Sequence, residues 1–296
     1  MKKPCILLIG LSGESVFLRV NHFASPGETL HAHGLYHEPG GKAYNQAVAA
    51  ARLGAESRLI TAVGRDGCGQ SCLDRLAQEG VLARGVFKDC PTAYAAIHTA
   101  DGGENTVTVF PGASKLLSPQ DLYDSAGLFT GADMLVLTCE LQPDTLETAF
   151  SMASERCVPV LLNPAPFHPI AKKLMDRACL LTPNRGEACA LLNLPLDATP
   201  KQIATAAGKW ETPLLVTLGA EGALLAEGSS HHFIPAPKVQ AVDATGAGDA
   251  FAAALAVRLC LGDALADAAA YAVRYASIST QRPYVLNSYP YAEDLA

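Results

Sequence analysis

Short runs of consecutive apolar residues recur along most of the chain, separated by stretches in which apolar positions repeat every three or four residues. A continuous apolar run predicts a strand buried on both faces, and the longer repeat predicts a helix. The alternation therefore predicts an α/β fold of three layers, α/β/α, in which helices cover both faces of a mostly parallel central sheet. The predicted strands are Ile6–Leu11, Arg58–Val63, Met134–Cys139, Val158–Asn163, Leu180–Thr182 and Leu214–Leu218. The predicted helices are Tyr44–Leu53, Gln70–Gln78, Thr145–Glu155, Glu187–Leu192, Lys201–Lys209, Ala250–Leu261 and Asp267–Thr280.

Two segments interrupt this alternation with patterns typical of β-structure. Val16–Tyr36 is strand-like with a Ser25-Pro26-Gly27 turn, and Thr92–Phe110 has the pattern of a hairpin. The hairpin strands are predicted at Tyr94–Thr99 and Thr106–Phe110, around Asp101-Gly102-Gly103.

These β pieces do not fit a repeating strand–helix unit, so we expect a small sheet beside the main one. It is built from about residues 15–37 and 92–111 and is placed to cover a site as a lid. We find no linker or internal repeat in the sequence and expect one domain over residues 1–296. The strand edges of an exposed small sheet can pair with another subunit, so we also expect a homodimer formed through the lid.

Composition narrows the function classes. With 49% hydrophobic and 17% charged residues the chain is typical of a compact globular protein. A net charge of −7 argues against a nucleic acid or an anionic membrane as partner. No apolar run is long enough to span a membrane, and nine scattered cysteines are typical of reduced thiols, so we expect a cytoplasmic protein.

The most informative motif is Asp243-Ala-Thr-Gly-Ala-Gly-Asp249, which leads directly into the predicted helix Ala250–Leu261. A turn of small residues before a helix exposes backbone N–H groups at the positive end of the helix dipole, an arrangement that binds phosphate. Asp249 then lies beside the bound anion, where a carboxylate can accept the proton of an acceptor hydroxyl. A simple helix cap would explain one Gly-Asp pair, but two glycines, a threonine and two aspartates in seven residues favour the phosphate site.

A second glycine-rich motif, Pro39-Gly-Gly-Lys-Ala-Tyr-Asn-Gln-Ala47, precedes a helix of small residues. Paired glycines allow a ligand to approach the backbone, and Lys42 and Asn45 offer hydrogen-bond donors. By itself a Gly-Gly pair before a helix is more often a tight turn.

Taken together, the two motifs resemble the signatures of the ribokinase-like, or phosphofructokinase B (PfkB) type, family of carbohydrate kinases. The resemblance covers essentially the whole chain, because further family-like stretches occur in the same order. These are Ser25-Pro-Gly-Glu-Thr29, Glu140 after a core strand, Asn163-Pro-Ala-Pro166, Thr182-Pro-Asn184-x-x-Glu187 and Thr217-Leu-Gly219-x-x-Gly222.

The resemblance implies a role for each matching residue. Asp249 is the general base, and the amides of Gly246, Ala247 and Gly248 form the anion hole. Asn184 and Glu187 help to hold magnesium and phosphate through water, as suits the hydration of Mg²⁺. The remaining residues fall into two groups. Thr217, Gly219 and Gly222 line the nucleotide, and Gly40, Gly41, Lys42, Asn45 and Glu140 face the sugar.

The chain departs from the family pattern in two places. Gly13 and Ser15 replace the Asn and Asp that usually follow the first strand and bind sugar hydroxyls. Glu14 cannot replace them without a β-bulge, because neighbouring strand residues point to opposite faces. Near the end, Arg282-Pro-Tyr-Val285 occupies the loop where the family binds a monovalent cation and usually has a glycine. Asp243 and Ser288 are candidate ligands there, and activation by K⁺ remains an open question.

The leading hypothesis is an enzyme that transfers the γ-phosphoryl group of ATP to a hydroxyl of a sugar or sugar-like molecule, with Mg²⁺. A nucleoside kinase on the same fold is the first alternative, since the pocket lacks two hydroxyl ligands. A non-catalytic regulator that binds sugar or nucleotide is the second.

Overall fold

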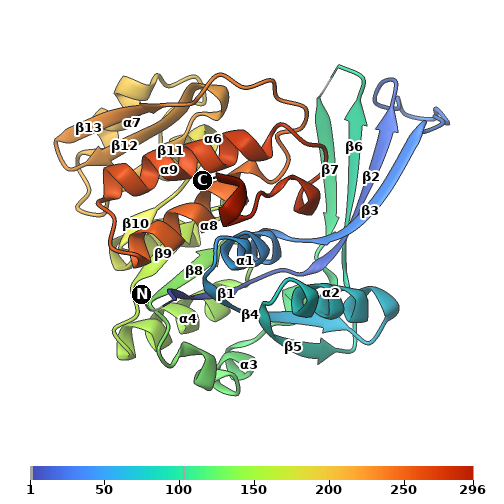
Figure 1. Cartoon of the computed structure of the whole chain (residues 1–296), viewed down its shortest axis with the longest axis horizontal. Helices are drawn as coiled ribbons and strands as arrows, with labels where there is room; N and C mark the ends of the chain where they lie inside the picture. Colours follow the sequence, from blue (N-terminus) through green and yellow to red (C-terminus); the bar gives the residue numbers. More distant parts are fainter. Residues whose placement is uncertain (1–2, 103, 296) are drawn as a thin grey trace.

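Within residues 3–102 and 104–295, which the computed structural model describes, nine strands form one central sheet in the order β13-β12-β11-β10-β9-β8-β1-β4-β5 (Figure 1). Across the sheet, every pair of neighbouring strands from β5 at one edge to β11 is parallel, whereas the pairs β11–β12 and β12–β13 are antiparallel. The mostly parallel sheet predicted from the apolar runs is confirmed. The strands are β1 (Cys5–Ile9), β4 (Glu56–Gly64), β5 (Leu82–Lys88), β8 (Met134–Thr138), β9 (Val160–Asn163), β10 (Leu180–Leu181), β11 (Leu214–Thr217), β12 (Gly222–Glu227) and β13 (Ser230–Pro235).

Helices cover both faces of this sheet, and successive residues of each strand pack on opposite sides. Ile6 and Leu8 belong to an apolar core with α1 (Lys42–Arg52), α2 (Gly67–Gln78), α8 (Ala247–Cys260) and α9 (Leu265–Ser279). Leu7 and Ile9 belong to a second core on the other face. That core includes residues of α3 (Pro119–Tyr123), α4 (Pro143–Glu155), α5 (Ile170–Leu174), α6 (Arg185–Leu192) and α7 (Pro200–Ala207). The three-layer prediction is therefore confirmed.

The elements that the apolar pattern did not predict lie mainly at the margins. β5 is an edge strand with partly exposed residues, and β12 with β13 forms an antiparallel hairpin at the other edge. α3 and α5 have five residues each, too few for a helical repeat to be visible.

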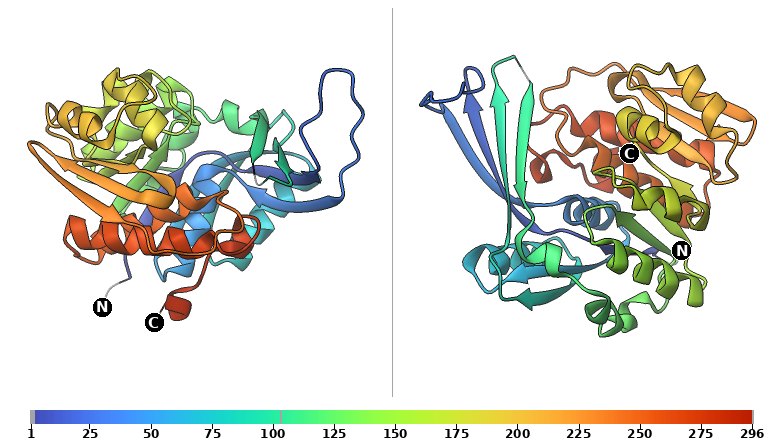
Figure 2. Two further views of the ribbon diagram at one scale, coloured as in Figure 1. Left: turned by 90° about the horizontal axis from the view of Figure 1, so that it is seen from above. Right: turned by 180° about the vertical axis from the view of Figure 1, so that it is seen from behind.

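A second, four-stranded sheet, called the small sheet below, lies beside the main one in the described part of the chain (Figures 1 and 2). Its order is β3-β2-β6-β7, and β2 pairs with β6 in parallel. The strands are β2 (Gly13–Val20), β3 (Gly34–Gly40), β6 (Ala93–Ala100) and β7 (Asn105–Phe110). The predicted hairpin is present as β6 and β7, although Gly103 of its expected turn lies outside the described residues.

The prediction for Val16–Tyr36 needs correction, because the segment is not strand throughout. Residues 21–33 form an irregular, mostly exposed loop between β2 and β3, visible at the upper right in the left view of Figure 2. The Ser25-Pro26-Gly27 turn lies in this loop, with Gly27 at a φ of 85°. The alternating pattern around the turn therefore overstated the extent of the strands.

None of the helices in residues 3–102 and 104–295 combines the length and the apolar composition that a bilayer crossing requires.

Candidate active site

Residues 243–248, called the 243–248 turn below, comprise the turn of small residues and the first two residues of α8, which begins at Ala247. Gly246 precedes it at a φ of 78°, a left-handed conformation that favours glycine. No side chain of the described residues caps this helix. Ala247 N donates to Ala244 O at 3.2 Å, whereas the amides of the following first-turn residues lack intrahelical partners. The turn thus presents donors at the positive end of a 14-residue helix.

Asp249 lies in the first turn of α8 and is 6% exposed. Its Oδ2 accepts a hydrogen bond from Asn45 Nδ2 at 2.9 Å, and its Oδ1 accepts one from Gln46 Nε2 at 3.1 Å. Burial raises the pKa of the Asp249 carboxyl, while Lys42 and the two amide donors favour the charged form and oppose that rise. The carboxylate is therefore held in one orientation and is more basic than a free aspartate.

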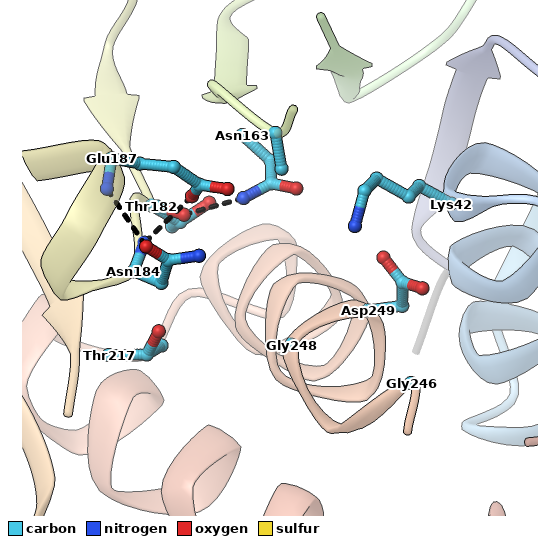
Figure 3. Close-up of a pocket in the computed structure, with 10 residues that line it drawn as sticks. Lys42, Asn163, Thr182, Asn184, Glu187, Thr217, Gly246, Gly248 and Asp249 are labelled. Carbon is cyan, nitrogen blue, oxygen red and sulfur yellow. Dashed lines mark hydrogen bonds between the residues drawn. The ribbon is translucent and has the colours of Figure 1, made fainter. Parts of the chain in front are cut away.

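Lys42 and Glu140 lie on the same side of the site as Asp249. In Figure 3 the ammonium group of Lys42 points toward the Asp249 carboxylate, whose negative charge raises the pKa of Lys42. Glu140 follows β8, and its carboxylate accepts hydrogen bonds from Lys42 N at 3.4 Å and Thr138 Oγ1 at 3.1 Å. Burial raises the pKa of Glu140 to about 7.

A cavity of about 100 Å³ opens beside the start of α8 (Figure 3). Since one water occupies roughly 30 Å³ of liquid, this cavity has room for a phosphate-sized group. Seven of the predicted site residues line it: Lys42, Asn184, Glu187, Thr217, Gly246, Gly248 and Asp249.

Asn184 and Glu187 form a reciprocal capping box at the start of α6. Glu187 N donates to Asn184 Oδ1 at 2.9 Å, and Asn184 N donates to Glu187 Oε2 at 2.8 Å. Burial raises the pKa of Glu187. The capping box uses one carboxylate oxygen of Glu187, Oε2. Glu187 also lines the cavity (Figure 3).

Three residues that line the cavity were not predicted as site residues: Asn163, Ala165 and Thr182. Asn163 ends β9 and donates from Nδ2 to Thr182 O at 2.6 Å. The sequence signal was available, because Asn163 is the last residue of a buried strand and Thr182 directly follows another, and ligands bind at the carboxyl ends of parallel strands. Gln46 was also missed, although it lies next to Asn45 in the second motif.

On the predicted sugar side, Ser15, Gly40 and Asn45 lie together. A Cβ at Gly40 would be 2.5 Å from Ser15 Oγ and 3.6 Å from Asn45 Oδ1. Gly41 has a φ of 117°, and a Cβ there would overlap Leu11 O. Both glycines therefore permit the close approach of α1 to β2 and the end of β1.

Position 13, unlike position 15, has no space for a side chain. A Cβ at Gly13 would overlap Ala93 O in the neighbouring strand β6. Glu14 points to the other face, where Oε1 lies 3.2 Å from His37 Nδ1. The expectation that Glu14 cannot replace the missing ligands agrees with this geometry.

The other predicted residues lie outside the cavity lining. Gly219 is exposed in the turn after β11, and a Cβ at Gly222 would overlap Ile234 O of β13, so Gly222 has a clear packing role. Asp243 accepts hydrogen bonds from Thr245 N and Tyr284 N. Ser288 is 1% exposed and donates from Oγ to Val285 O at 2.7 Å.

Polar residues thus converge at the carboxyl ends of β8, β9, β10 and β11, facing an uncapped helix start and a buried carboxylate. This combination of fold and site is characteristic of a small-molecule kinase, in which amide donors meet the transferred phosphoryl group and a carboxylate meets the acceptor hydroxyl.

Comparison with known proteins agrees with this class. The sequence pattern described as "pfkB family carbohydrate kinase" matches residues 7–292. The ribokinase of Bacillus subtilis (strain 168) is 32% identical over 280 residues, covering 94% of this chain and 93% of that protein. The deoxyribokinase of Salmonella typhi is 32% identical over 297 residues, covering 97% and 96%. A solved structure of Arabidopsis thaliana ribokinase complexed with ribose and ATP superposes with a TM-score of 0.87 at 25% identity, covering 99% of this chain and 98% of that one.

The chain belongs to the pfkB family of carbohydrate kinases, and it is an ATP-dependent sugar kinase. The predicted family, fold class and enzyme class are therefore confirmed. The kinase class also disfavours the non-catalytic regulator.

Proposed function

We propose that this enzyme transfers the γ-phosphoryl group of ATP to a hydroxyl of a sugar or sugar-like molecule, with Asp249 as the general base. The observation that carries the proposal is the burial of Asp249 in the first turn of α8, where Asn45 and Gln46 hold both carboxylate oxygens. A carboxylate with a raised pKa, next to amides that can stabilise an anion, suits proton removal from a hydroxyl during phosphoryl transfer.

We also propose a role for each of the residues around Asp249. The amides of Gly246, Ala247 and Gly248 stabilise charge on the transferred group, and Lys42 supplies a positive charge between the nucleotide and the acceptor. Thr217 and the Gly219–Gly222 turn line the nucleotide. Gly40, Gly41, Asn45, Glu140 and Ser15 face the acceptor. Gly13 contributes a close backbone contact rather than a side chain.

The residues at the cavity fit Mg²⁺ held through water. Glu187 offers a carboxylate, and the buried Thr182 Oγ1 has no hydrogen-bond partner among the described residues. Hard oxygen groups of this kind suit Mg²⁺, which keeps several of its waters. When bound, the ion supplies positive charge to the phosphate oxygens, while Asn184 and Glu187 orient the water around it.

The small sheet is proposed to act as a lid that excludes water from the transfer. Asn105 at the start of β7 donates from Nδ2 to Thr245 Oγ1 at 3.4 Å, so the tip of the small sheet reaches the 243–248 turn. This contact joins the two sides of the site.

The test is the release of ADP from Mg-ATP across pentoses, hexoses, sugar acids and nucleosides. A productive acceptor should lose turnover by roughly two to four orders of magnitude in Asp249→Asn, because the substitution removes a general base. Asp263→Asn is the matched control, since Asp263 follows the other end of α8 and pairs with Arg258 at 2.5 Å. Near-normal turnover in Asp249→Asn would exclude Asp249 as the base.

A second candidate function is phosphorylation of a less hydroxylated acceptor, such as a nucleoside or a deoxy sugar. Gly13 has no side chain and no room for one, and Ser15 offers a single hydroxyl where the family usually has a carboxylate. One relative of the chain is a deoxyribokinase. The same acceptor panel, extended to deoxy sugars, separates the two candidates, because the second requires turnover with nucleosides or deoxy sugars and weak turnover with ribose.

A further inference from the structure

Residues 284–289, which we call the C-terminal strap, lie against the start of α8. A Cβ at Gly246 would be 2.5 Å from Val285 Cγ1 and 2.7 Å from Tyr289 Oη. Tyr289 is 1% exposed, and its hydroxyl donates to Gly246 O at 2.8 Å. Because a peptide is planar, fixing the Gly246 carbonyl also sets the direction of the Ala247 N–H. That N–H donates to Ala244 O at 3.2 Å, and Gly246 O also accepts Ala250 N at 2.9 Å. The strap therefore fixes the peptide from which the free amides of the proposed anion hole follow.

Two buried side chains, the carboxyl group of Glu38 and the guanidinium group of Arg52, hold the strap in place. Glu38 of β3 accepts hydrogen bonds from Val285 N at 2.7 Å and Leu286 N at 3.1 Å. Arg52 at the end of α1 donates to Leu286 O and, at 2.9 Å, to Tyr289 O. Glu79 accepts two further bonds from the Arg52 guanidinium at 2.8 and 2.6 Å. The strap is thus fixed to both the small sheet and the main core.

Tyr284 makes a third connection, between the strap and the small sheet. Its ring stacks on Tyr36 at a centroid distance of 3.7 Å and an angle of 18°, and meets the edge of Phe17 at 5.3 Å. Tyr284 has a φ of 67°, which is unfavourable for a residue with a Cβ. The aromatic stack and the hydrogen bond from Tyr284 N to Asp243 Oδ2 at 3.0 Å stabilise this conformation.

The resemblance to the family implies a monovalent cation at this place, and the donor set does not fit one. Asp243 Oδ1 accepts Thr245 N at 2.9 Å, and Oδ2 accepts the N–H of Tyr284, so a backbone amide is directed at each carboxylate oxygen. Ser288 is engaged with Val285 O through both its amide and its hydroxyl. K⁺ is held in proteins by several oxygens that converge on one point, whereas the Asp243 and Ser288 side chains are each directed at backbone groups of the turn and the strap.

We propose that the C-terminal strap, rather than a bound monovalent cation, fixes the phosphate-binding turn and couples it to the small sheet. Tyr289 is the positioning residue that acts on Gly246, and Tyr284 links the strap to the small sheet. Turnover is accordingly independent of K⁺. The proposal rests on the proposed role of the 243–248 turn in binding the γ-phosphoryl group.

The first test compares Tyr289→Phe with Tyr275→Phe, using calorimetric affinities for Mg-AMP-PNP and Mg-ADP. Tyr275 is the matched control, because it is also 1% exposed and its hydroxyl also donates to a carbonyl, Pro290 O at 3.0 Å. Loss of one hydrogen bond should weaken AMP-PNP binding about tenfold in Tyr289→Phe and leave ADP within about twofold. Tyr275→Phe should leave both affinities within about twofold. If the ratio of the AMP-PNP affinity to the ADP affinity were the same in both variants, the positioning role of Tyr289 would be overturned. Thermal melts check that each variant is folded.

The second test measures kcat in potassium chloride and in tetramethylammonium chloride at equal ionic strength. We expect the two values to agree within about twofold, whereas an increase of about tenfold or more with K⁺ would overturn the proposal. The kcat of Asp249→Asn is measured in the same two salts, and its affinities for Mg-AMP-PNP and Mg-ADP are measured with those of the other variants. If that variant retained turnover, the base assignment would fail, while the AMP-PNP to ADP ratio would still report on the strap.

Discussion

At the residue scale, the site depends on how α1 meets Asp249. Lys42, Asn45 and Gln46 are spaced i, i+3 and i+4, so one face of the first turns of α1 presents a positive charge and two amide donors. Asn45 and Gln46 donate hydrogen bonds to the carboxylate, and the positive charge of Lys42 favours its ionised form. This spacing explains why Gln46 belongs with the two residues that the motif identified.

The pKa of Glu140 predicts the pH dependence of the enzyme. Burial raises this pKa to about 7, so the carboxyl is protonated below that pH and ionised above it. A carboxylate accepts hydrogen bonds from an acceptor's hydroxyls, whereas the protonated form accepts them less well. We therefore expect kcat/KM to rise with pH through about 7. The apparent pKa of this rise belongs to Glu140 and Asp249 together, because the two carboxyl groups interact.

Glu140→Gln should raise the KM for the acceptor and flatten this part of the pH profile. Glu147→Gln, on the exposed side of α4, is the matched control and should keep the wild-type profile. A wild-type kcat/KM that stays constant between pH 6 and 8 would contradict the assignment, and those limits lie about one unit either side of the expected pKa.

At the scale of elements, the small sheet is joined to the main core through glycines. Gly13, Gly40 and Gly41 lie where β2, β3 and α1 approach one another, and a Cβ at any of them would overlap a neighbour. The Gly13–Ala93 pair also starts the parallel ladder between β2 and β6. The position of the small sheet beside the main one therefore depends on backbone contact at these residues.

Gly13→Ala should destabilise the protein by about 1–3 kcal/mol, the usual cost of overpacking, because the methyl group would meet Ala93 O. The measurement is the free energy of unfolding from denaturant titration. Gly127→Ala is the matched control, since a Cβ there meets nothing within 4 Å and its change should stay within about 0.5 kcal/mol. Equal stability of the two variants would show that β6 moves away from β2 at little cost.

At the scale of the whole molecule, the exposed apolar residues of the small sheet predict self-association. Leu35 is 64% exposed, and Val107 and Phe110 are about half exposed. β3 and β7 are also the two edge strands of this sheet. Apolar side chains beside unpaired strand edges favour an interface, so we expect a homodimer formed through the small sheet.

Light scattering should give twice the chain mass of 30.9 kDa at micromolar concentration. Leu35→Lys should shift the protein toward the monomer, because a charge at the interface would have to be buried. Leu196→Lys, which replaces a residue 76% exposed and distant from the small sheet in sequence, should leave the mass unchanged. A monomer mass for the unaltered protein would contradict the dimer prediction.

Much of the architecture could be predicted from the sequence, because burial on both faces produces local apolar patterns. The runs at β1, β4, β8 and β9 identified the core strands to within a few residues, and the motifs placed Asp249, Lys42, Asn184 and Glu187 around one site. The loop at residues 21–33 was missed because a polar alternation can occur in an exposed strand or in an irregular loop. The hairpin of β12 and β13 was missed because its outer strand is mostly exposed.

By itself, the sequence determined the α/β class, the family and the residues that we propose for phosphoryl transfer, since these follow from periodicity and short motifs. Only the tertiary structure decided how distant segments meet. Asn45 reaches Asp249 across 204 positions, Glu38 reaches Val285 across 247, and Tyr289 reaches Gly246 across 43. Such contacts leave no local periodicity, because they arise when packing of the two sheets and the C-terminal strap brings buried polar groups together and each group requires a partner.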